Sequence, residues 1–455
     1  MQQQQQQQQT PLTSDKRDLD HKNSKANTQG RYPGRARQKP IRLGITDQSD
    51  FEEDFVVDSN YTFINYCFAV TDAPRTFKQA LSSAESTQWK LAMDKEHNIL
   101  IENDTYELVE LPYGEKAVPG RWVYILKPDQ VGTTKHRARW CAKGFHQEHG
   151  VNYEETFSPT AKIQSTRMVV QVAAQDDMIV GQMDVNAAYL NADIDCDVYM
   201  QQPDGYVEDP SKVCKLKKAI YGLKQAGRQW NCLLNECLSK DGFVKSEADP
   251  CLFTKNTEDG RVILLVWVDD LIIATSNLDL LNNVKTFLSN SFQMKDLGSL
   301  HWFLGIEFNV TRNAISMNQS QYIHNILARF GMSDCKPKST PCDPSVYDLL
   351  QTESDVLENA TLYREIVGSL IYLMTSTRPD LAYVVNLLSQ YMSSPHTVHL
   401  TIAKSVLRYI KGTIDYKLQY VKSNNGLKLT VFSDSDWGSS PDRHSILPRF
   451  QRYHM

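Results

Sequence analysis

The chain has 455 residues, enough for two or three domains, and its 41% hydrophobic and 10% aromatic content can form buried cores. No apolar run approaches the roughly 18 residues of a membrane span and no signal peptide is recognisable, so we expect no membrane partner. The net charge of −5 argues against nucleic-acid binding only if the total is considered.

The first segment, residues 1–60, begins with a run of glutamines and continues with polar residues. Too little apolar surface is present to offset chain entropy, so this segment is predicted to be disordered. Its basic stretch at 31–42 fits three uses: a nucleic-acid contact, a nuclear import patch or a solvated linker.

Residues 61–345 are predicted to form the first folded region. Apolar residues at helical spacing predict a helix over 75–101, in which Trp89 faces the core. Strand-like segments follow it, and the last two suggest a hairpin through PDQVGT: 106–111, 121–127 and 137–142.

The pattern then alternates between helices and strands. A helix is expected over 164–180 and a strand over 181–186, which carries Asp184. The later elements are a helix at 227–241, a strand pair within 262–275, an amphipathic helix at 278–293, and a hairpin with a helix formed by 301–308 and 314–327.

Charge is distributed unevenly along this region. Residues 116–143 hold seven basic residues and one acidic residue, Asp129. Residues 212–228 hold six basic residues and no acidic residue. Residues 183–210 lie between these two blocks, and all of their charged residues are acidic. Basic blocks beside an acidic strand suit a polyanionic substrate delivered to a cation site, although each block alone is equally typical of a solvated face.

The cysteines support one alternative metal site at most. The nine cysteines are scattered without a CxxC pair, which indicates reduced thiols in the cytosol or nucleus. Cys141, His146 and His149 have the residue types of a zinc site but lack a fourth ligand at a suitable spacing. Solvated loop histidines are the alternative reading.

Residues 262–275, VILLVWVDDLIIAT, contain adjacent carboxylates at Asp269 and Asp270 between two apolar runs. Burying both would cost several kcal/mol for each unpaired charge. The pair therefore lies at an exposed hairpin turn, or a cation such as Mg²⁺ neutralises it. Asp184 would supply a third carboxylate from another strand. Taken alone, Asp184 is more typical of a solvent-exposed aspartate at the end of a strand.

Three ordered motifs resemble the reverse transcriptase of copia-type long-terminal-repeat retrotransposons. They are DVNAAYL at 184–190, YGLKQAGRQW at 221–230 and WVDDL at 267–271. Segments that fit the same family flank them: ENDTYELVELP at 102–112, RARWCAKGFHQEHGVNYEETFSP at 137–159, VYMQQPDGY at 198–206, MKDLGSLHWFLGIE at 294–307, YREIVGSLIYLMTSTRPDLAY at 363–383 and VLRYIKGT at 406–413.

This resemblance implies an α+β right-hand polymerase with fingers, an antiparallel-sheet palm and a thumb. It also implies a helical connection region at 346–425 and a truncated ribonuclease H start at 426–455. The implied reaction is Mg²⁺-dependent addition of deoxynucleotides to a primer 3′ end, with two Mg²⁺ ions or Mn²⁺ in their place. The implied partners are an RNA or DNA template with its primer, deoxynucleoside triphosphates and the protease and integrase parts of a polyprotein. A cytoplasmic virus-like particle or the nucleus is the expected location.

The resemblance also assigns roles to residues. Asp184 and Asp269 would be the ligands shared by both metal ions, and Asp270 would flank them. Tyr189 would exclude a ribose 2′-hydroxyl, although an aromatic residue there also suits a core. The remaining nucleotide contacts would be Gln225, Lys224 and Arg228 together with Arg137, Arg139 and Lys143, and the primer contacts would be Trp267, Phe303, Leu304 and Gly305.

Alternation along a strand is expected to place Arg137, Arg139 and Lys143 on one face. For Phe303, Leu304 and Gly305 a core hairpin is an equally good interpretation.

Some residues depart from the family pattern. Trp267 replaces the usual Tyr or Phe, and Gly227 replaces the usual Pro. Asp434 occupies the first metal-ligand position of ribonuclease H, but the chain then ends in HSILPRFQRYHM. We therefore expect no ribonuclease H activity and no further strand to pair after it. Two alternatives remain: an inactive remnant that at most binds nucleic acid, and a different metal nucleotidyltransferase.

Overall fold

The computed structural model describes residues 73–128, 134–350, 354–432 and 452–454. The predicted disordered segment at 1–60, the tip of the PDQVGT hairpin and Asp434 lie outside these residues. Within them, helices combine with sheets whose named strands all pair in antiparallel fashion, which confirms the α+β class. No described helix has both the length and the apolar character needed to cross a membrane.

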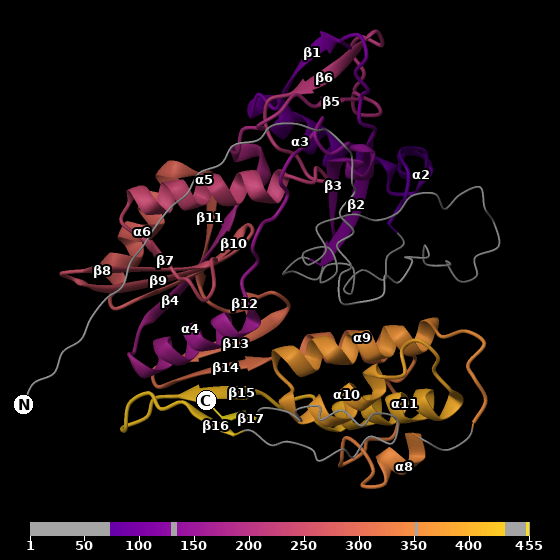
Figure 1. Ribbon diagram of the computed structural model, residues 1–455, viewed down its shortest axis with the longest axis vertical. Coiled ribbons are helices and arrows are strands. Elements are labelled where there is room, and N and C mark those ends of the chain that lie inside the picture. The colour runs from indigo at the N-terminus through magenta and orange to yellow at the C-terminus, as the bar shows by residue number, and fades with distance from the viewer. Residues whose placement is uncertain (1–72, 129–133, 351–353, 433–451, 455) are drawn as a thin grey trace, which may run out of the picture. The chain divides into compact units, whose positions relative to one another are not determined.

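A six-stranded antiparallel sheet forms the centre of the fold, in the order β11-β4-β10-β9-β8-β7 (Figure 1). Asp270 lies opposite Trp267 on one neighbouring strand and opposite Asp184 on the other. The strands are β4 (Ile179–Val185), β7 (Val244–Lys245), β8 (Leu252–Thr257), β9 (Gly260–Trp267), β10 (Asp270–Thr275) and β11 (Met294–Ser299).

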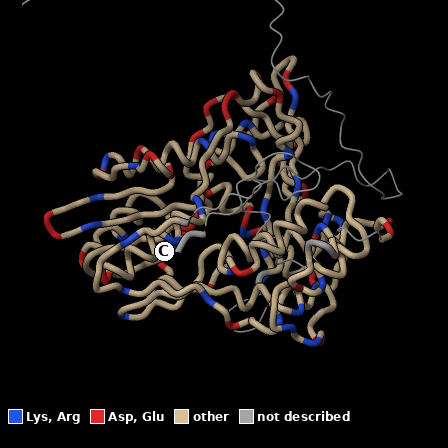
Figure 2. Tube along the Cα trace, turned by 60° about the horizontal axis from the view of Figure 1, so that its bottom comes forward, with Lys and Arg blue, Asp and Glu red and all other residues tan. Residues whose placement is uncertain are grey.

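Both faces of this sheet are covered, which explains the nearly continuous apolar runs in β9 and β10. Helices α5 (Ala226–Lys240) and α6 (Leu278–Ser291) lie on one side and α4 (Ile163–Gln175) lies on the other (Figure 1). Leu264 and Ile272 are fully buried in the two clusters, and each such side chain contributes about 1.5–3 kcal/mol. Figure 2 shows an acidic turn, which joins β8 to β9.

The predicted helix over 75–101 is divided in two. Helix α2 (Phe77–Ser82) ends before Ser83, which has an extended backbone, and α3 (Ser86–Glu102) follows. Trp89 is 1% exposed, so its predicted core position is confirmed. The other elements here are β1 (Tyr106–Glu110), β2 (Gly120–Pro128), β3 (Thr134–Ala142), η1 (Gly144–His146), η2 (Ala188–Asn191), β5 (Tyr199–Met200) and β6 (Lys212–Leu216).

The hairpin predicted from the segments 121–127 and 137–142 is confirmed. Strand β2 pairs with β3 in a regular register that starts with Gly120 opposite Ala142. A second sheet, β1-β6-β5, lies beside it in the same part of the fold. The helix predicted over 164–180 is shorter than expected. It ends at Gln175, and Asp177 adopts a φ of +49° before β4 begins.

The hairpin and helix predicted for 301–327 are confirmed, and a later strand joins them. Strand β15 (Leu418–Val421) pairs with β14, so the chain returns to this sheet after the helical region. The elements are β12 (Trp302–Phe303), β13 (Ile306–Thr311), β14 (Ala314–Asn318), α7 (Ser320–Arg329), α8 (Val346–Leu350), α9 (Thr361–Ser376), η3 (Pro379–Leu381), α10 (Ala382–Ser389) and α11 (Thr397–Gly412).

One expectation about the last residues is wrong. Strand β16 (Thr430–Phe432) pairs with β17 (Arg452–His454), with Thr430 opposite His454. The final residues therefore supply the pairing strand that the sequence was expected to lack, because Tyr and Val suit a strand pair even in a short segment.

Candidate active site

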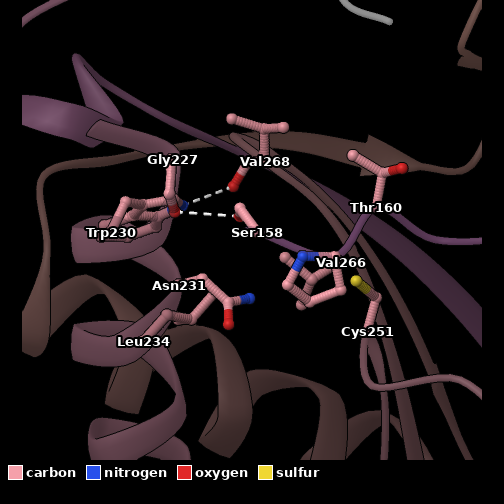
Figure 3. Close-up of a pocket in the computed structure, with 10 residues that line it drawn as sticks. Ser158, Thr160, Gly227, Trp230, Asn231, Leu234, Cys251, Val266 and Val268 are labelled. Atoms are coloured by element: carbon pink, nitrogen blue, oxygen red, sulfur yellow. Dashed lines mark hydrogen bonds between the residues drawn. The ribbon is translucent and has the colours of Figure 1, made fainter. Parts of the chain in front are cut away.

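A two-residue turn joins β9 to β10 and contains the first residue of the Asp-Asp pair, while the second, Asp270, begins β10. Val268 and Asp269 occupy the turn, and Val268 has a φ of +55°. This conformation is unusual for a β-branched residue and costs of order 1–3 kcal/mol. Trp230 on α5 donates a hydrogen bond from Nε1 to the Val268 carbonyl oxygen at 2.7 Å (Figure 3). Helix α5 therefore holds the turn in its strained shape.

Two of the three predicted carboxylates lie next to each other across strands. Asp184 on β4 is the direct partner of Asp270 on β10. Directly opposed residues point to the same face of an antiparallel sheet, with Cβ atoms about 4.5–5.5 Å apart. The amide of Val185 donates to the carbonyl oxygen of Asp269 at 2.8 Å, which fixes the turn against β4.

The third carboxylate, Asp269, is buried. Its side chain is 5% exposed, and its Oδ1 atom has no hydrogen-bond partner. Burial, together with the charge of Asp184, raises the pKa of Asp269 to about 6. A buried carboxylate oxygen without a partner is costly unless a cation or donor reaches it, so this atom suits a divalent ion.

The protein atoms alone do not form a complete metal cage. Among the residues that the structure describes, no three or more Asp, Glu, His or Cys side chains converge as a metal-binding group. The described structure therefore gives no support to the zinc alternative at Cys141, His146 and His149. The carboxylates still suit Mg²⁺, because Mg²⁺ is usually held by one or two carboxylates together with substrate phosphates and water.

Two arginines on β3 provide positive charge near Asp269. Arg137 and Arg139 share one face of the strand, and both act to lower the pKa that burial raises in Asp269. Arg139 is 8% exposed, and its guanidinium carbon lies 3.8 Å from the centre of the Tyr221 ring. Strand β3 ends at Ala142, so the alternation argument does not extend to Lys143, and its predicted role remains a prediction.

Tyr189 and Tyr221 pack together beside these charges. Tyr189 is 4% exposed in η2, and its ring centre lies 4.7 Å from that of Tyr221. Burial raises the pKa of Tyr221 to about 12, so its hydroxyl stays neutral. The sequence pattern alone does not single out Tyr221. It opens the YGLKQAGRQW motif, but nothing local shows that it contacts both Tyr189 and Arg139.

Gln225 has a different environment from the one expected. Its side chain is fully buried, and its Nε2 donates to the Asn152 carbonyl oxygen at 2.9 Å. Its Oε1 accepts a hydrogen bond of 3.0 Å from Gln147. Both ends of the amide are thus used within the protein. The predicted nucleotide contact stays a prediction, and the structure gives Gln225 a role in fixing the loop that contains Gln147.

The neighbouring basic residues also contact this loop. Lys224 donates from Nζ to the Tyr153 hydroxyl at 3.1 Å. Arg228 forms an ion pair of 2.8 Å with Glu155, whose side chain is largely exposed. An exposed pair of this kind contributes about 0–1 kcal/mol, so Arg228 can exchange Glu155 for a phosphate at little cost.

The predicted primer contacts divide into a core residue and a turn. Phe303 is 1% exposed and belongs to the core, as the alternative interpretation held. Leu304 and Gly305 form a two-residue turn between β12 and β13, with φ angles of +51° and +73°. Trp267 and Leu304 pack against the same hydrophobic cluster, and the buried Nε1 atom of Trp267 has no hydrogen-bond partner.

A small cavity lies behind the Val268 turn (Figure 3). Its volume is about 30 Å³, room for about one water molecule. Ser158 donates to the Gly227 carbonyl oxygen at 3.0 Å, and a Cβ atom added to Gly227 would lie 3.3 Å from that of Ser158. Gly227 therefore permits the close approach of this loop to the start of α5.

Comparison with known proteins supports the motif assignment. The profile of the reverse transcriptase (RNA-dependent DNA polymerase) family matches residues 103–344. The chain is 41% identical over 378 residues to the Retrovirus-related Pol polyprotein from transposon RE1 of Arabidopsis thaliana, covering 82% of this chain and 25% of that protein. It is 36% identical over 380 residues to the corresponding polyprotein from transposon TNT 1-94 of Nicotiana tabacum, covering 81% and 28%. The chain thus spans about a quarter of these relatives.

Proposed function

Because the chain belongs to the reverse transcriptase (RNA-dependent DNA polymerase) family, we propose that it adds deoxynucleotides to a primer 3′ end on an RNA or DNA template. The observation that carries this proposal is the carboxylate arrangement. Asp184 and Asp270 face each other across β4 and β10, and the buried Asp269 oxygen beside them lacks a partner. Arg137 and Arg139 supply positive charge close enough to lower the pKa of Asp269.

In this proposal Asp184 and Asp269 hold two Mg²⁺ ions, or Mn²⁺ as a substitute, and Asp270 flanks Asp184. When bound, the metal stabilises the developing charge on the primer oxygen and on the triphosphate. Arg139 and Arg137 orient the triphosphate. Neither arginine needs to donate a proton, since guanidinium groups remain charged.

Tyr189 and Tyr221 set the wall of the nucleotide site. Tyr189 excludes a ribose 2′-hydroxyl by steric contact, and Tyr221 holds it in place through the ring contact of 4.7 Å. Because the guanidinium of Arg139 packs on the same Tyr221 ring, sugar selection and triphosphate binding share one support.

Primer extension on an RNA template with Mg²⁺ tests the proposal. Asp184→Asn and Asp269→Asn should each reduce extension by about 10³-fold or more, because each removes charge that stabilises the transition state. Asp259→Asn, in the exposed turn between β8 and β9, is the matched control and should leave extension unchanged.

Extension at the wild-type rate by both site variants would refute the proposed site. A wild-type protein that binds primer–template but extends no primer under any condition would instead favour the inactive remnant. The unusual Trp267, with its unpartnered Nε1, is the feature that favours this second candidate.

A further inference from the structure

The Leu304–Gly305 turn is attached to the catalytic strand on one side. Gln182, which is 2% exposed, donates from Nε2 to the Trp302 carbonyl oxygen at 2.8 Å. Gln182 lies two residues before Asp184 on β4, so both side chains point to the same face of the sheet. The turn that follows Trp302 is therefore anchored to the strand that carries a proposed metal ligand.

On its other side, the same turn is attached to the helical region. The hydroxyl of Tyr372 on α9 donates a hydrogen bond to the Leu304 carbonyl oxygen. The ring of Tyr372 packs edge-on against Tyr322 of α7, with centres 4.9 Å apart. Arg167 of α4 donates to the carbonyl oxygens of Thr375 and Ser376 at 2.8 and 2.6 Å, which fixes the same end of α9.

This turn needs such a support for the same reason as the turn at Val268. Leu304 has a φ of +51°, a left-handed conformation that disfavours any residue with a Cβ atom. In both turns an aromatic side chain from a helix donates to the carbonyl oxygen of the left-handed residue: Trp230 to Val268 and Tyr372 to Leu304. The donor fixes the direction of a peptide that would otherwise relax.

We propose that Tyr372 is a positioning residue that holds the Leu304–Gly305 turn against the catalytic strand, so that helix α9 controls where the primer end is bound. This inference rests on the proposed function and on the primer contact that the family resemblance predicts for Leu304 and Gly305. The order of contacts is α9, Tyr372, the turn, Trp302 and Gln182, and it ends two residues from Asp184.

The test compares Tyr372→Phe with Tyr322→Phe in the full chain. The first variant removes only the hydroxyl that reaches the turn. The second is a matched control, since the Tyr322 hydroxyl donates at 3.4 Å to the Ser369 carbonyl oxygen, away from the turn. Hydrogen exchange of the amides at 303–306 should be about five- to tenfold faster than in the wild type for Tyr372→Phe and unchanged for Tyr322→Phe. This factor is the one expected for the loss of one hydrogen bond.

Steady-state primer extension supplies the functional measurement. Tyr372→Phe should raise the KM for primer–template by about five- to tenfold while leaving the KM for nucleotide within about twofold. Exchange or KM values equal to those of Tyr322→Phe would overturn the inference, as would a parallel rise in both KM values. If the wild-type chain extends no primer, the proposed function fails, and the exchange measurement alone decides whether Tyr372 holds the turn.

Discussion

Replacing Trp230 with Phe removes the hydrogen bond that holds the strained Val268 carbonyl group. This bond is partly buried, and a carbonyl left there without a donor costs about 1–3 kcal/mol. The smaller ring enlarges the cavity behind the turn, which at about 24 cal/mol per Å³ adds about 1 kcal/mol. We therefore expect Trp230→Phe to lower the free energy of unfolding by about 2–4 kcal/mol.

Trp267→Phe is the matched comparison. Trp267 lies in the same turn region, but its Nε1 atom has no partner, so its removal breaks no hydrogen bond. The free energy of unfolding should change by less than about 1 kcal/mol, because a buried donor without a partner is itself unfavourable. Urea denaturation followed by far-ultraviolet circular dichroism measures both variants.

Val268→Gly in the Trp230→Phe background tests the strain directly. Glycine adopts a φ of +55° without a Cβ clash, so the double variant should regain about 1 kcal/mol relative to Trp230→Phe. The reasoning is refuted if Trp230→Phe and Trp267→Phe lower stability equally, or if Val268→Gly destabilises both backgrounds to the same extent.

Three further predictions address the nucleotide site and the helical region. Tyr189→Val should weaken discrimination against ribonucleotides by about 1–3 kcal/mol, measured as the ratio of kcat/KM for the two sugars; unchanged selectivity in an active variant would place Tyr189 in the core alone. Tyr221→Leu should raise the KM for nucleotide and relax sugar choice together, whereas Tyr221→Phe, which keeps the ring beneath Arg139, should do neither. Burial lowers the pKa of His399 in the folded chain, so as the pH falls the histidine is protonated in the unfolded chain before it is protonated in the folded chain. The free energy of unfolding should therefore decrease as the pH drops below about 6.5 towards the pKa of the folded state. This pH-dependent loss of stability should be smaller in His399→Gln than in the wild type. Equal slopes of unfolding free energy against pH for the two proteins would contradict the prediction.

Local physical chemistry determined much of the fold in advance. Apolar runs with strand preferences identified β9 and β10, and the two adjacent carboxylates between them predicted either an exposed turn or a bound cation. The helix ends were less predictable, because a short break such as the one at Ser83 depends on packing rather than on a strong local signal. The paired strand at Arg452–His454 was missed for the same reason.

The site itself depended on register and packing. The sequence identifies Asp184 and Asp270 as candidates through their motifs, but only the pairing of β4 with β10 places them opposite each other. A shift of one residue would turn one carboxylate to the other face of the sheet. That register is set by contacts between segments far apart in the chain.

The supports of the site are also tertiary. Tyr221 reaches Arg139 and Tyr189 from a separate loop, and Tyr372 reaches the Leu304 turn from a helix that begins more than fifty residues later. Each of these side chains would be an ordinary half-buried aromatic residue in its own segment. Its role comes from the polar group that the folded chain brings to it, because a hydrogen bond or a ring contact acts only over a few ångströms.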